Sequence, residues 1–352
     1  MLRLSFDSTS LCRARLTGVG VYTQALAKAL MANSEIDFSA SYRVSRWKKA
    51  HYITSHLGVK PRTYFPNLPQ LTLSGTDIFH GPDFKIPKNG NFKKIVTVHD
   101  LANYKPFYGT ENAKLAHKNL NKMLFSCKPD HIITVSEYVK DELEALFPHT
   151  KGMVTAIHSG INHLKLASRK ESETPVFIYI GTIEARKNLS NLIKAFALVH
   201  ELNPNAKLIL AGGVGMGGAE ILEELANSKV KKAISYEGFI SNERKSQLLS
   251  SGTAFIYPSL YEGFGLPILE AMLASCPVIT ANFGACAEIS NNHAWEVNVN
   301  EPEAIAKAMV DIVNNKELAS SKAIEAYKYS LEFTWERCAY NTYMIYKKVL
   351  TS

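Results

Sequence analysis

Short apolar runs alternate with amphipathic stretches along the first half of the chain. The apolar runs cover residues 2–6, 36–40, 77–80, 94–98, 131–135 and 154–157. Helical patterns lie between several of them, notably at 21–31, 113–126 and 139–146. Strands of a parallel sheet are covered on both faces, so they read as continuous apolar runs rather than as alternating ones. The pattern therefore predicts a parallel sheet covered by helices.

The second half repeats this alternation more regularly. Predicted strands cover 176–180, 207–210, 234–236, 254–257, 278–280 and 295–297. Predicted helices follow at 189–202, 219–226, 241–250, 266–273 and 302–313. Alternating strands and helices are typical of doubly wound α/β domains, whose ligands bind at the carboxyl ends of the strands. We therefore predict the α/β class, with two facing doubly wound, Rossmann-like domains and a cleft between them.

A polar segment at 165–175, KLASRKESETP, separates the two halves and ends in a proline before a new strand. The chain of 352 residues is long enough for two domains of ordinary size, each with its own core. We predict a first domain at 1–168 and a second at 169–333.

With 46% hydrophobic and 20% charged residues, the chain has the composition of a soluble globular protein. No apolar run approaches the ~18 residues that a membrane span needs, and the N-terminal segment lacks the apolar core of a signal peptide. The five cysteines are scattered without metal-binding spacing, which suits a reducing compartment. These features predict a cytoplasmic location.

The excess positive charge is confined to the first half. Residues 1–168 contain 22 Lys and Arg against 12 Asp and Glu, whereas 169–352 contain 18 against 20. Basic residues gather with Trp47, Tyr52 and Tyr64; they are Arg43, Arg46, Lys48, Lys49, Lys60 and Arg62. This mixture suits an anionic membrane that presents a lipid acceptor, a solvated face, or nucleic acid. We favour a peripheral position at the inner face of the membrane, and no nucleic acid partner.

The segment 259–272, SLYEGFGLPILEAM, holds two carboxylates eight positions apart, Glu262 and Glu270. Between them, Gly263 and Gly265 let the backbone approach a ligand, and Pro267 suits a first helical turn. The free amides of that turn form an anion site. Because a carboxylate would repel phosphate, the two glutamates are better suited to hydroxyl groups. Phosphate flanked by hydroxyls describes a nucleotide sugar.

Arg186 and Lys187 follow the predicted strand 176–180 through Gly181 and precede a predicted helix. An arginine fork and a lysine ammonium at the carboxyl end of a strand suit a diphosphate. The alternative is a surface turn. The two glutamates three strand–helix units later favour the diphosphate.

The first domain offers two further candidate contacts. Gly18 and Gly20 form a G-x-G turn after the first predicted strand, where the backbone can approach a sugar or phosphate. His99 follows the predicted strand 94–98, and His80 ends the strand before it. A histidine at the carboxyl end of a strand is either a ligand contact or a satisfied core residue. We favour His99 as the contact.

No D-x-D, H-E-x-x-H or C-x-x-C motif occurs in the sequence. The carboxylate pair that commonly holds magnesium on a diphosphate is therefore missing. We predict a site without metal or cofactor, in which Arg186, Lys187 and helix amides offset the diphosphate charge.

Five segments resemble elements of the family 4 glycosyltransferases, retaining enzymes of the GT-B fold, in the expected order. They are TGVGVYTQAL, VHDL, SEYVKDEL, GTIEARKNL and EGFGLPILE. Glutamates eight positions apart are the hallmark of that family. The next segment is similar to the family's continuation, with Glu288 as its acidic residue, although Ala287 stands where the family usually has proline. The resemblance covers essentially the whole chain.

The resemblance implies a role for each matching position. Glu262 would contact the hydroxyls of the donor sugar, and Glu270 the ribose. Arg186 and Lys187 would hold the diphosphate, and His99 would lie beside the transfer centre. Further donor contacts would come from Gly18, Gly20, Gly181, Phe239, Ile240, Gly263, Phe264, Gly265 and Leu266, with Phe239 and Ile240 at the nucleobase. A last helix, within 334–352, would cross back onto the first domain.

The implied activity is retaining transfer of a hexose from a nucleotide diphosphate sugar to a glycan or lipid-linked acceptor. Mannose from GDP-mannose is favoured, in polysaccharide or lipopolysaccharide synthesis. No carboxylate is an obvious nucleophile, which favours front-face attack assisted by the leaving phosphate. Three alternatives stay open: a nucleotide-sugar epimerase, a catalytically inactive partner subunit that binds nucleotide sugar, and a nucleic-acid binder.

Overall fold

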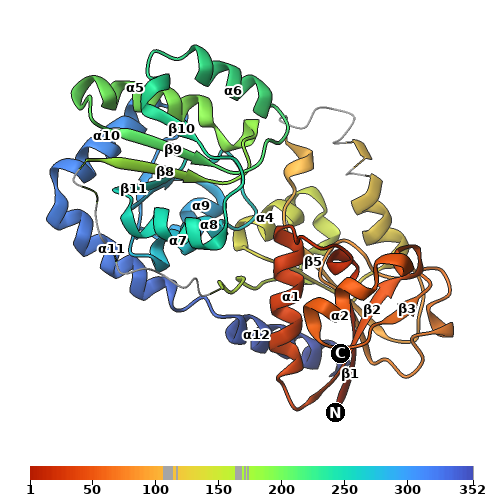
Figure 1. The fold of residues 1–352 in the computed structure, drawn as a ribbon. Helices are drawn as coiled ribbons and strands as arrows, with labels where there is room; N and C mark the ends of the chain where they lie inside the picture. The colour runs from red at the N-terminus through yellow and green to blue at the C-terminus, as the bar shows by residue number, and fades with distance from the viewer. Residues whose placement is uncertain (106–113, 116–117, 163–168, 170–171, 173, 352) are drawn as a thin grey trace. The chain divides into compact units, whose positions relative to one another are not determined.

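The computed structural model describes residues 1–105, 114–115, 118–162, 169, 172 and 174–351. The chain divides into two compact units, Met1–Gly160 with Phe333–Ser352, and Ile161–Glu332 (Figure 1). Each unit holds one parallel sheet covered by helices. The predicted α/β class with two doubly wound sheets is confirmed. Much of the polar segment predicted to separate the domains lies outside the described residues.

The sheet of unit 1 has seven strands in the order β3-β2-β1-β4-β5-β6-β7. Every neighbouring pair is parallel. Phe6, Ile78 and Ile95 in its central strands are fully buried, as expected for strands covered on both faces. The strands are β1 (Leu2–Asp7), β2 (Ile36–Arg43), β3 (Arg62–Tyr64), β4 (Ile78–Gly81), β5 (Lys93–Val98), β6 (His131–Thr134) and β7 (Val154–Ala156).

Helices pack against this sheet, and the last helix of the chain is one of them. The α-helices are α1 (Gly18–Met31), α2 (His51–Leu57), α4 (Glu137–Leu146) and α12 (Trp335–Thr351). The side chain of Ser136 caps α4 by accepting a hydrogen bond from the Val139 amide. Helix α12 packs against α1. Its Tyr346 hydroxyl lies 2.6 Å from His80 Nδ1, so the chain's last helix belongs to unit 1.

Short helical turns follow several strands of unit 1. The 3-10 turns are η1 (Thr9–Leu11), η2 (Val44–Lys49), η3 (Pro69–Leu71), η4 (Ala102–Tyr104) and η7 (Pro148–Thr150). The segment η6 (Lys122–Cys127) is a π-helix. The predicted helix at 113–126 therefore ends in a π-helical segment, and part of it lies outside the described residues.

The sheet of unit 2 has six parallel strands in the order β10-β9-β8-β11-β12-β13. They are β8 (Val176–Ile180), β9 (Lys207–Ala211), β10 (Ile234–Tyr236), β11 (Ala254–Tyr257), β12 (Val278–Ala281) and β13 (Trp295–Val297). Five of the helices are α5 (Leu189–Leu202), α6 (Gly218–Asn227), α7 (Asn242–Ser251), α8 (Leu266–Leu273) and α10 (Pro302–Asn314). These elements agree closely with the predicted ones.

Among the strands and α-helices of the described residues, four were not predicted: β3 and α2 in unit 1, and α9 (Gly284–Ser290) and α11 (Lys316–Ser330) in unit 2. Helix α11 packs against α8, and α9 also packs against α8. Helices α5, α6 and α10 pack together on the other face of this sheet (Figure 1). None of the helices in the described part of the chain is both long and apolar enough to cross a bilayer.

Candidate active site

The order of the strands in unit 2 reverses at its centre, and this reversal marks a site. Strands β8 and β11 are neighbours in the sheet, but the chain runs from β8 toward β9 on one side and from β11 toward β12 on the other. Ligands of doubly wound sheets bind outside the carboxyl ends of the strands at such a switch point. The segments after β8 and β11 meet here, since the Leu260 amide donates to the Arg186 carbonyl at 2.8 Å.

The segment after β8 is held by its own backbone and by residues distant in sequence. Ile183 forms a bridge with Val214, and Ala185–Lys187 form a 3-10 turn, η8. Asn188 then adopts the left-handed conformation with φ 59°, one that asparagine tolerates better than most residues. Its side-chain amide donates to the Val299 carbonyl at 2.7 Å. The backbone under Arg186 and Lys187 is thereby fixed.

Arg186, Lys187 and Glu262 form one buried ion cluster. Lys187 Nζ pairs with Glu262 Oε1, and Arg186 Nη1 lies 3.0 Å from Glu262 Oε2. Arg186 Nε pairs in turn with Glu184 Oε1 at 2.7 Å. The side chains of Lys187 and Glu262 are only 6% and 11% exposed. Arg186, Lys187 and Glu262 were predicted as site residues, and Glu184 was not. Glu262 was expected to face hydroxyl groups rather than these cations.

Hydroxyl groups complete the cluster. Lys187 Nζ donates to the Tyr257 hydroxyl at 2.6 Å and lies over its ring. Ser259 Oγ donates to Glu262 at 2.5 Å. Neither Tyr257 nor Ser259 was predicted as a site residue. Their signal was positional: Tyr257 ends strand β11, and Ser259 lies three residues before Glu262.

The cluster fixes the charge state of Glu262. Burial alone would raise the pKa of Glu262, but the Lys187 ammonium and the Arg186 guanidinium lower it to about 2. Glu262 is therefore ionised at neutral pH and can accept hydrogen bonds but not donate a proton. Two carboxylates, Glu184 and Glu262, balance the two cations. A phosphate that binds here must compete with these carboxylates for Arg186 and Lys187.

Helix α8 begins beside this cluster. Gly265 precedes its first residue with φ 114°, a conformation that residues with a Cβ rarely adopt. Gly263 and Phe264 are buried, whereas Leu266 is partly exposed. Pro267 lies in the first turn, where its missing amide hydrogen costs no helical hydrogen bond. The amides of this turn can therefore receive an anion.

Glu270 lies on α8 and has a different ion-pair partner from Glu262. Its Oε1 pairs with Lys245 Nζ on α7 at 2.8 Å, and both side chains are about one fifth exposed. The two glutamates of the E-x(7)-E pattern therefore have different partners, which is consistent with different roles. Lys245 was not predicted, because the SNERKSQ stretch gives it no distinguishing spacing.

Phe239 and Ile240 lie in the turn after β10. Phe239 is 70% exposed, while Ile240 is half-buried. The ring of Phe239 lies over Gly213, where an added Cβ would approach it to 2.3 Å. An exposed aromatic ring held against backbone can stack on a flat base. On the other side of the turn, Gly181 lies so close to Gly212 that a Cβ on Gly212 would overlap the Gly181 carbonyl.

In unit 1, the two glycines of the G-x-G turn differ. Gly18 is the first residue of α1 and is exposed, with no atom within 4 Å of an added Cβ. Gly20 is buried, and an added Cβ would lie 3.2 Å from Leu16. Gly18 thus leaves room for a ligand at the start of α1, whereas Gly20 serves packing within the helix.

His99 and His80 also differ. His99 Nε2 lies 2.7 Å from the Pro82 carbonyl, and its ring meets Tyr22 edge-on at 4.6 Å. It is partly exposed, and burial lowers its pKa. His80 is fully buried, with Nδ1 at the Tyr346 hydroxyl and Nε2 at Thr97 Oγ1. Burial lowers the pKa of His80 to about 3. The idea that His80 lines a ligand site is wrong, because it is a neutral core residue.

Residues 162–329 match the family model described as glycosyl transferases group 1. This segment, which makes up most of unit 2, belongs to that family. The matched range includes Gly181, Arg186, Lys187, Glu262 and Glu270, so the ion cluster of this glycosyltransferase lies inside the family segment.

The glycosyltransferase is also similar to individual proteins. It is 28% identical over 288 residues to O-antigen chain mannosyltransferase B of Escherichia coli, covering 77% of this chain and 74% of that protein. It is 27% identical over 222 residues to O-antigen chain mannosyltransferase RfbU of Salmonella typhimurium, covering 62% and 60%.

Solved structures share its fold. Sucrose-phosphate synthase from Thermosynechococcus elongatus superimposes with a TM-score of 0.77 at 18% identity, covering all of both chains. Alr3699/HepE from Anabaena, in complex with UDP, gives 0.72 at 15% identity, covering 99% of this chain and 100% of the other. These likenesses establish the GT-B fold of the glycosyltransferase.

Proposed function

We propose that this glycosyltransferase transfers mannose from a nucleotide diphosphate sugar, preferably GDP-mannose, to a glycan or lipid-linked acceptor with retention of anomeric configuration. The observation that carries the proposal is the buried cluster of Arg186, Lys187 and ionised Glu262 at the switch point of unit 2. Two O-antigen mannosyltransferases among the relatives support mannose and a place in polysaccharide synthesis.

The cluster suits a donor in which phosphate and hydroxyls lie side by side. Arg186 and Lys187 bind the diphosphate, and Glu262 accepts hydrogen bonds from the hexose hydroxyls. Amides of Gly263–Leu266 add donors at the start of α8, where the helix dipole favours negative charge. Arg186 is the more adaptable cation, because it divides its guanidinium between Glu184 and Glu262.

Residues next to the ion cluster bind the nucleoside part of the donor. Glu270 accepts hydrogen bonds from the ribose, with Lys245 fixing its carboxylate. Phe239 and Ile240 contact the nucleobase, and Gly181 permits close approach at the end of β8. In unit 1, Gly18 leaves the start of α1 open to the sugar phosphate, and Gly20 supports that backbone through close packing against Leu16.

Transfer depends on stabilising the leaving diphosphate. As the glycosidic bond breaks, negative charge grows on the phosphate, and fixed cations and amides stabilise it most in the transition state. Glu262 keeps Arg186 and Lys187 ordered before the donor binds. The acceptor hydroxyl then attacks the anomeric carbon from the face that the diphosphate leaves and gives its proton to an oxygen of the departing phosphate, which retains the configuration.

His99 contributes as a neutral acceptor. The Pro82 carbonyl can only accept a hydrogen bond, so Nε2 carries the ring hydrogen and Nδ1 keeps its lone pair. Since burial lowers the pKa of His99, the ring stays neutral at pH 7. Its Nδ1 can therefore orient a sugar hydroxyl without adding charge.

A peripheral membrane contact of unit 1 is part of the proposal. Trp47 is 63% exposed on η2, and Lys48 Nζ lies 5.5 Å from the centre of its ring. An exposed indole beside basic residues suits the interface of an anionic membrane, such as the inner face of the cytoplasmic membrane.

The experiment that tests the function combines donor binding with transfer. A thermal-shift panel of GDP-, UDP- and ADP-sugars identifies the donor, because ligand that binds the native state raises its stability. GDP-mannose should give the largest shift, and mannose should appear on the acceptor. Interconversion of sugars without transfer would indicate an epimerase, and binding without turnover an inactive subunit. No response to any nucleotide sugar would refute the proposal.

A further inference from the structure

Unit 1 has a switch point of its own, and a cavity lies there. Strands β1 and β4 are neighbours at the centre of the sheet, while the chain runs from β1 toward β2 and from β4 toward β5. A cavity of about 570 Å³ is lined by segments that follow β1, β2 and β4. Its size falls in the range of small-molecule sites, and its position is where doubly wound sheets bind ligands.

Basic side chains dominate this cavity. It is lined by six of them, Arg13, Arg15, Arg43, Arg46, Lys49 and Lys85, against one carboxylate, Asp83. Asp83 already pairs with Lys85. Among the residues that the structure describes, Arg13, Arg46 and Lys49 form no ion pair. The cavity is therefore strongly positive before any ligand binds.

One of these cations, Arg43, is held in place by a network of hydrogen bonds. Arg43 Nε donates to the Tyr64 hydroxyl at 3.2 Å, and that hydroxyl donates to buried Asp7 at 2.7 Å. The Arg43 amide also donates to Thr9 Oγ1 at 3.1 Å, which ties the end of β2 to η1. Even with Asp7 counted, the lining keeps four positive charges in excess of the carboxylates.

The 3-10 turn η2 divides the basic cluster of the sequence into two faces. Residues three apart lie above one another in a 3-10 helix, so Arg46 and Lys49 share a face. These two line the cavity, whereas Trp47 and Lys48 do not. The basic residues of η2, which form one cluster in the sequence, therefore lie at two places in the structure: Arg46 and Lys49 line the cavity, and Lys48 lies outside it.

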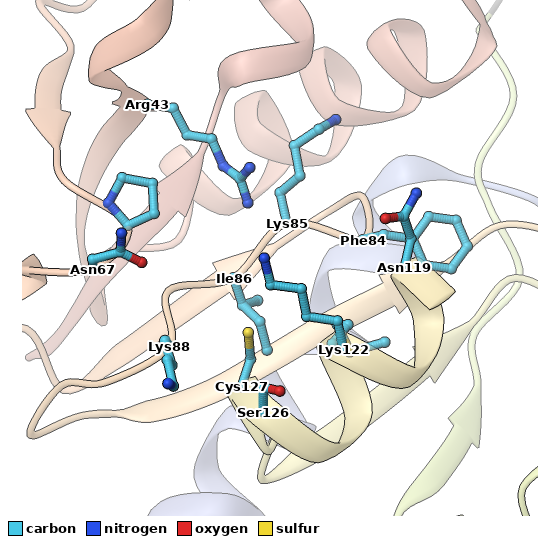
Figure 2. Close-up of a pocket in the computed structure, with 12 residues that line it drawn as sticks. Arg43, Asn67, Phe84, Lys85, Ile86, Lys88, Asn119, Lys122, Ser126 and Cys127 are labelled. Carbon is cyan, nitrogen blue, oxygen red and sulfur yellow. The ribbon is translucent and has the colours of Figure 1, made fainter. Parts of the chain in front are cut away.

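A second cavity of about 350 Å³ adjoins the first, since Arg43 and Lys85 line both. Figure 2 shows Arg43 and Lys122 pointing toward one another from opposite sides of it. Its lining mixes basic groups with the apolar side chains of Phe84, Ile86 and Met123. The first cavity is thus the more basic of the two, and the second is amphipathic.

We propose that this cavity binds a phosphate or diphosphate group of the acceptor, so that the sugar is transferred to an anionic, phosphate-bearing substrate. The inference rests on the proposed function and names its acceptor class. The donor brings one diphosphate, for which unit 2 already supplies Arg186 and Lys187. The excess positive charge of unit 1 fits a second anion, and arginine forks at Arg13 and Arg46 suit its oxygens.

The test compares two triple variants of the full-length chain. One is R13Q/R46Q/K49Q, which removes three cavity charges. The matched control is K229Q/K231Q/K232Q, which removes three charges from exposed positions of unit 2. Inorganic pyrophosphate is titrated calorimetrically into each protein saturated with GDP, so that the donor site is filled. Thermal unfolding checks that each variant folds.

Pyrophosphate should bind the wild type and the control, and the cavity variant about 100-fold more weakly, since charge-assisted hydrogen bonds are lost. GDP affinity should be equal in all three proteins. In transfer assays, the wild type should prefer an alkyl sugar phosphate over the matching neutral alkyl glycoside, and the cavity variant should lose this preference. The loss should appear as a higher KM for the phosphate-bearing acceptor, with kcat unchanged.

Equal pyrophosphate binding by all three proteins would overturn the inference. Weakened GDP binding by the cavity variant would show that the cavity holds the donor diphosphate instead. Loss of vesicle sedimentation without loss of pyrophosphate binding would assign these charges to a membrane. If the wild type binds no nucleotide sugar, the proposed function fails, whereas pyrophosphate binding still reports on the cavity.

Discussion

Replacing Lys187 by methionine should destabilise unit 2, because it leaves Glu262 in a buried position with one cation fewer. The fall in the pKa of Glu262 from 4.5 to about 2 corresponds to roughly 3 kcal/mol of stability. Breaking a buried pair by removing one partner typically costs about 3–5 kcal/mol. Arg186 and Ser259 still contact Glu262 in the variant, so we expect a loss of about 3 kcal/mol at pH 7.

The loss should depend on pH in a defined direction. The pKa of Glu262 is lower in the folded than in the unfolded chain, so its contribution is complete above about pH 4.5 and disappears as the pH falls through about 2. The difference in stability between wild type and K187M should therefore shrink to about half by pH 3. The pH-dependent part of the loss reports the ion pair between Lys187 and Glu262. The hydrogen bond from Lys187 to Tyr257 is also lost in the variant, but that loss is the same at all pH values.

The matched control is K245M, which removes the partner of Glu270. The Lys245 and Glu270 side chains are at least twice as exposed as the Lys187 and Glu262 pair, so water screens their interaction more and this loss should be smaller than that of K187M. Urea titrations at pH 7 and pH 3, read by pulsed hydrogen exchange of peptides from unit 2, measure both variants. Equal losses for K187M and K245M, or a pH-independent loss for K187M, would refute the electrostatic reasoning.

Four further predictions concern activity and binding. Arg186→Ala should lower kcat/KM on the order of 100-fold, about 2.7 kcal/mol, and steady-state kinetics with wild-type values would contradict its role. Glu270→Ala should weaken calorimetric binding of free nucleotide, whereas Glu262→Ala should impair transfer without weakening that binding, because Glu262 competes with the diphosphate for Arg186 and Lys187; equal weakening by both variants would reject this division. Transfer should persist in excess EDTA, and recovery of lost activity by magnesium would show a metal requirement. Trp47→Ser with Lys48→Ser should abolish sedimentation with anionic vesicles but spare transfer to a soluble acceptor.

The sheets could be predicted because their strands are uninterrupted apolar runs. Strand β11 and helix α5 have the predicted bounds, since burial on both faces leaves a clear pattern in each. Strand β3 was missed because only Tyr64 of its three residues is buried, and a short edge strand gives little apolar signal. Helix α9 was missed for a similar reason, since seven residues span only two turns.

The members of the ion cluster could be predicted, but their contacts could not. Arg186 and Glu262 are far apart in sequence and meet because β8 lies beside β11, an order that no local pattern specifies. The sequence also suggests that a carboxylate avoids a phosphate site. Buried cations need a counter-charge when no ligand is present, and Glu262 supplies it. The two faces of η2 could not be predicted either, because Arg46 and Trp47 lie on different faces only as a result of its 3-10 helical register.

The two switch points resemble each other in topology and differ in charge. In unit 2, Arg186 and Lys187 are balanced by Glu184 and Glu262, so the cluster is neutral and rigid before the donor binds. In unit 1, the cavity keeps unbalanced cations at exposed positions such as Arg46 and Lys49. A neutral, preorganised cluster interacts most favourably with the negative charge that develops in the transition state. Unbalanced exposed charges instead attract an anion from solution, and salt screens that attraction. The same fold is thereby suited to catalysis at one switch point and to capture of an anionic acceptor at the other.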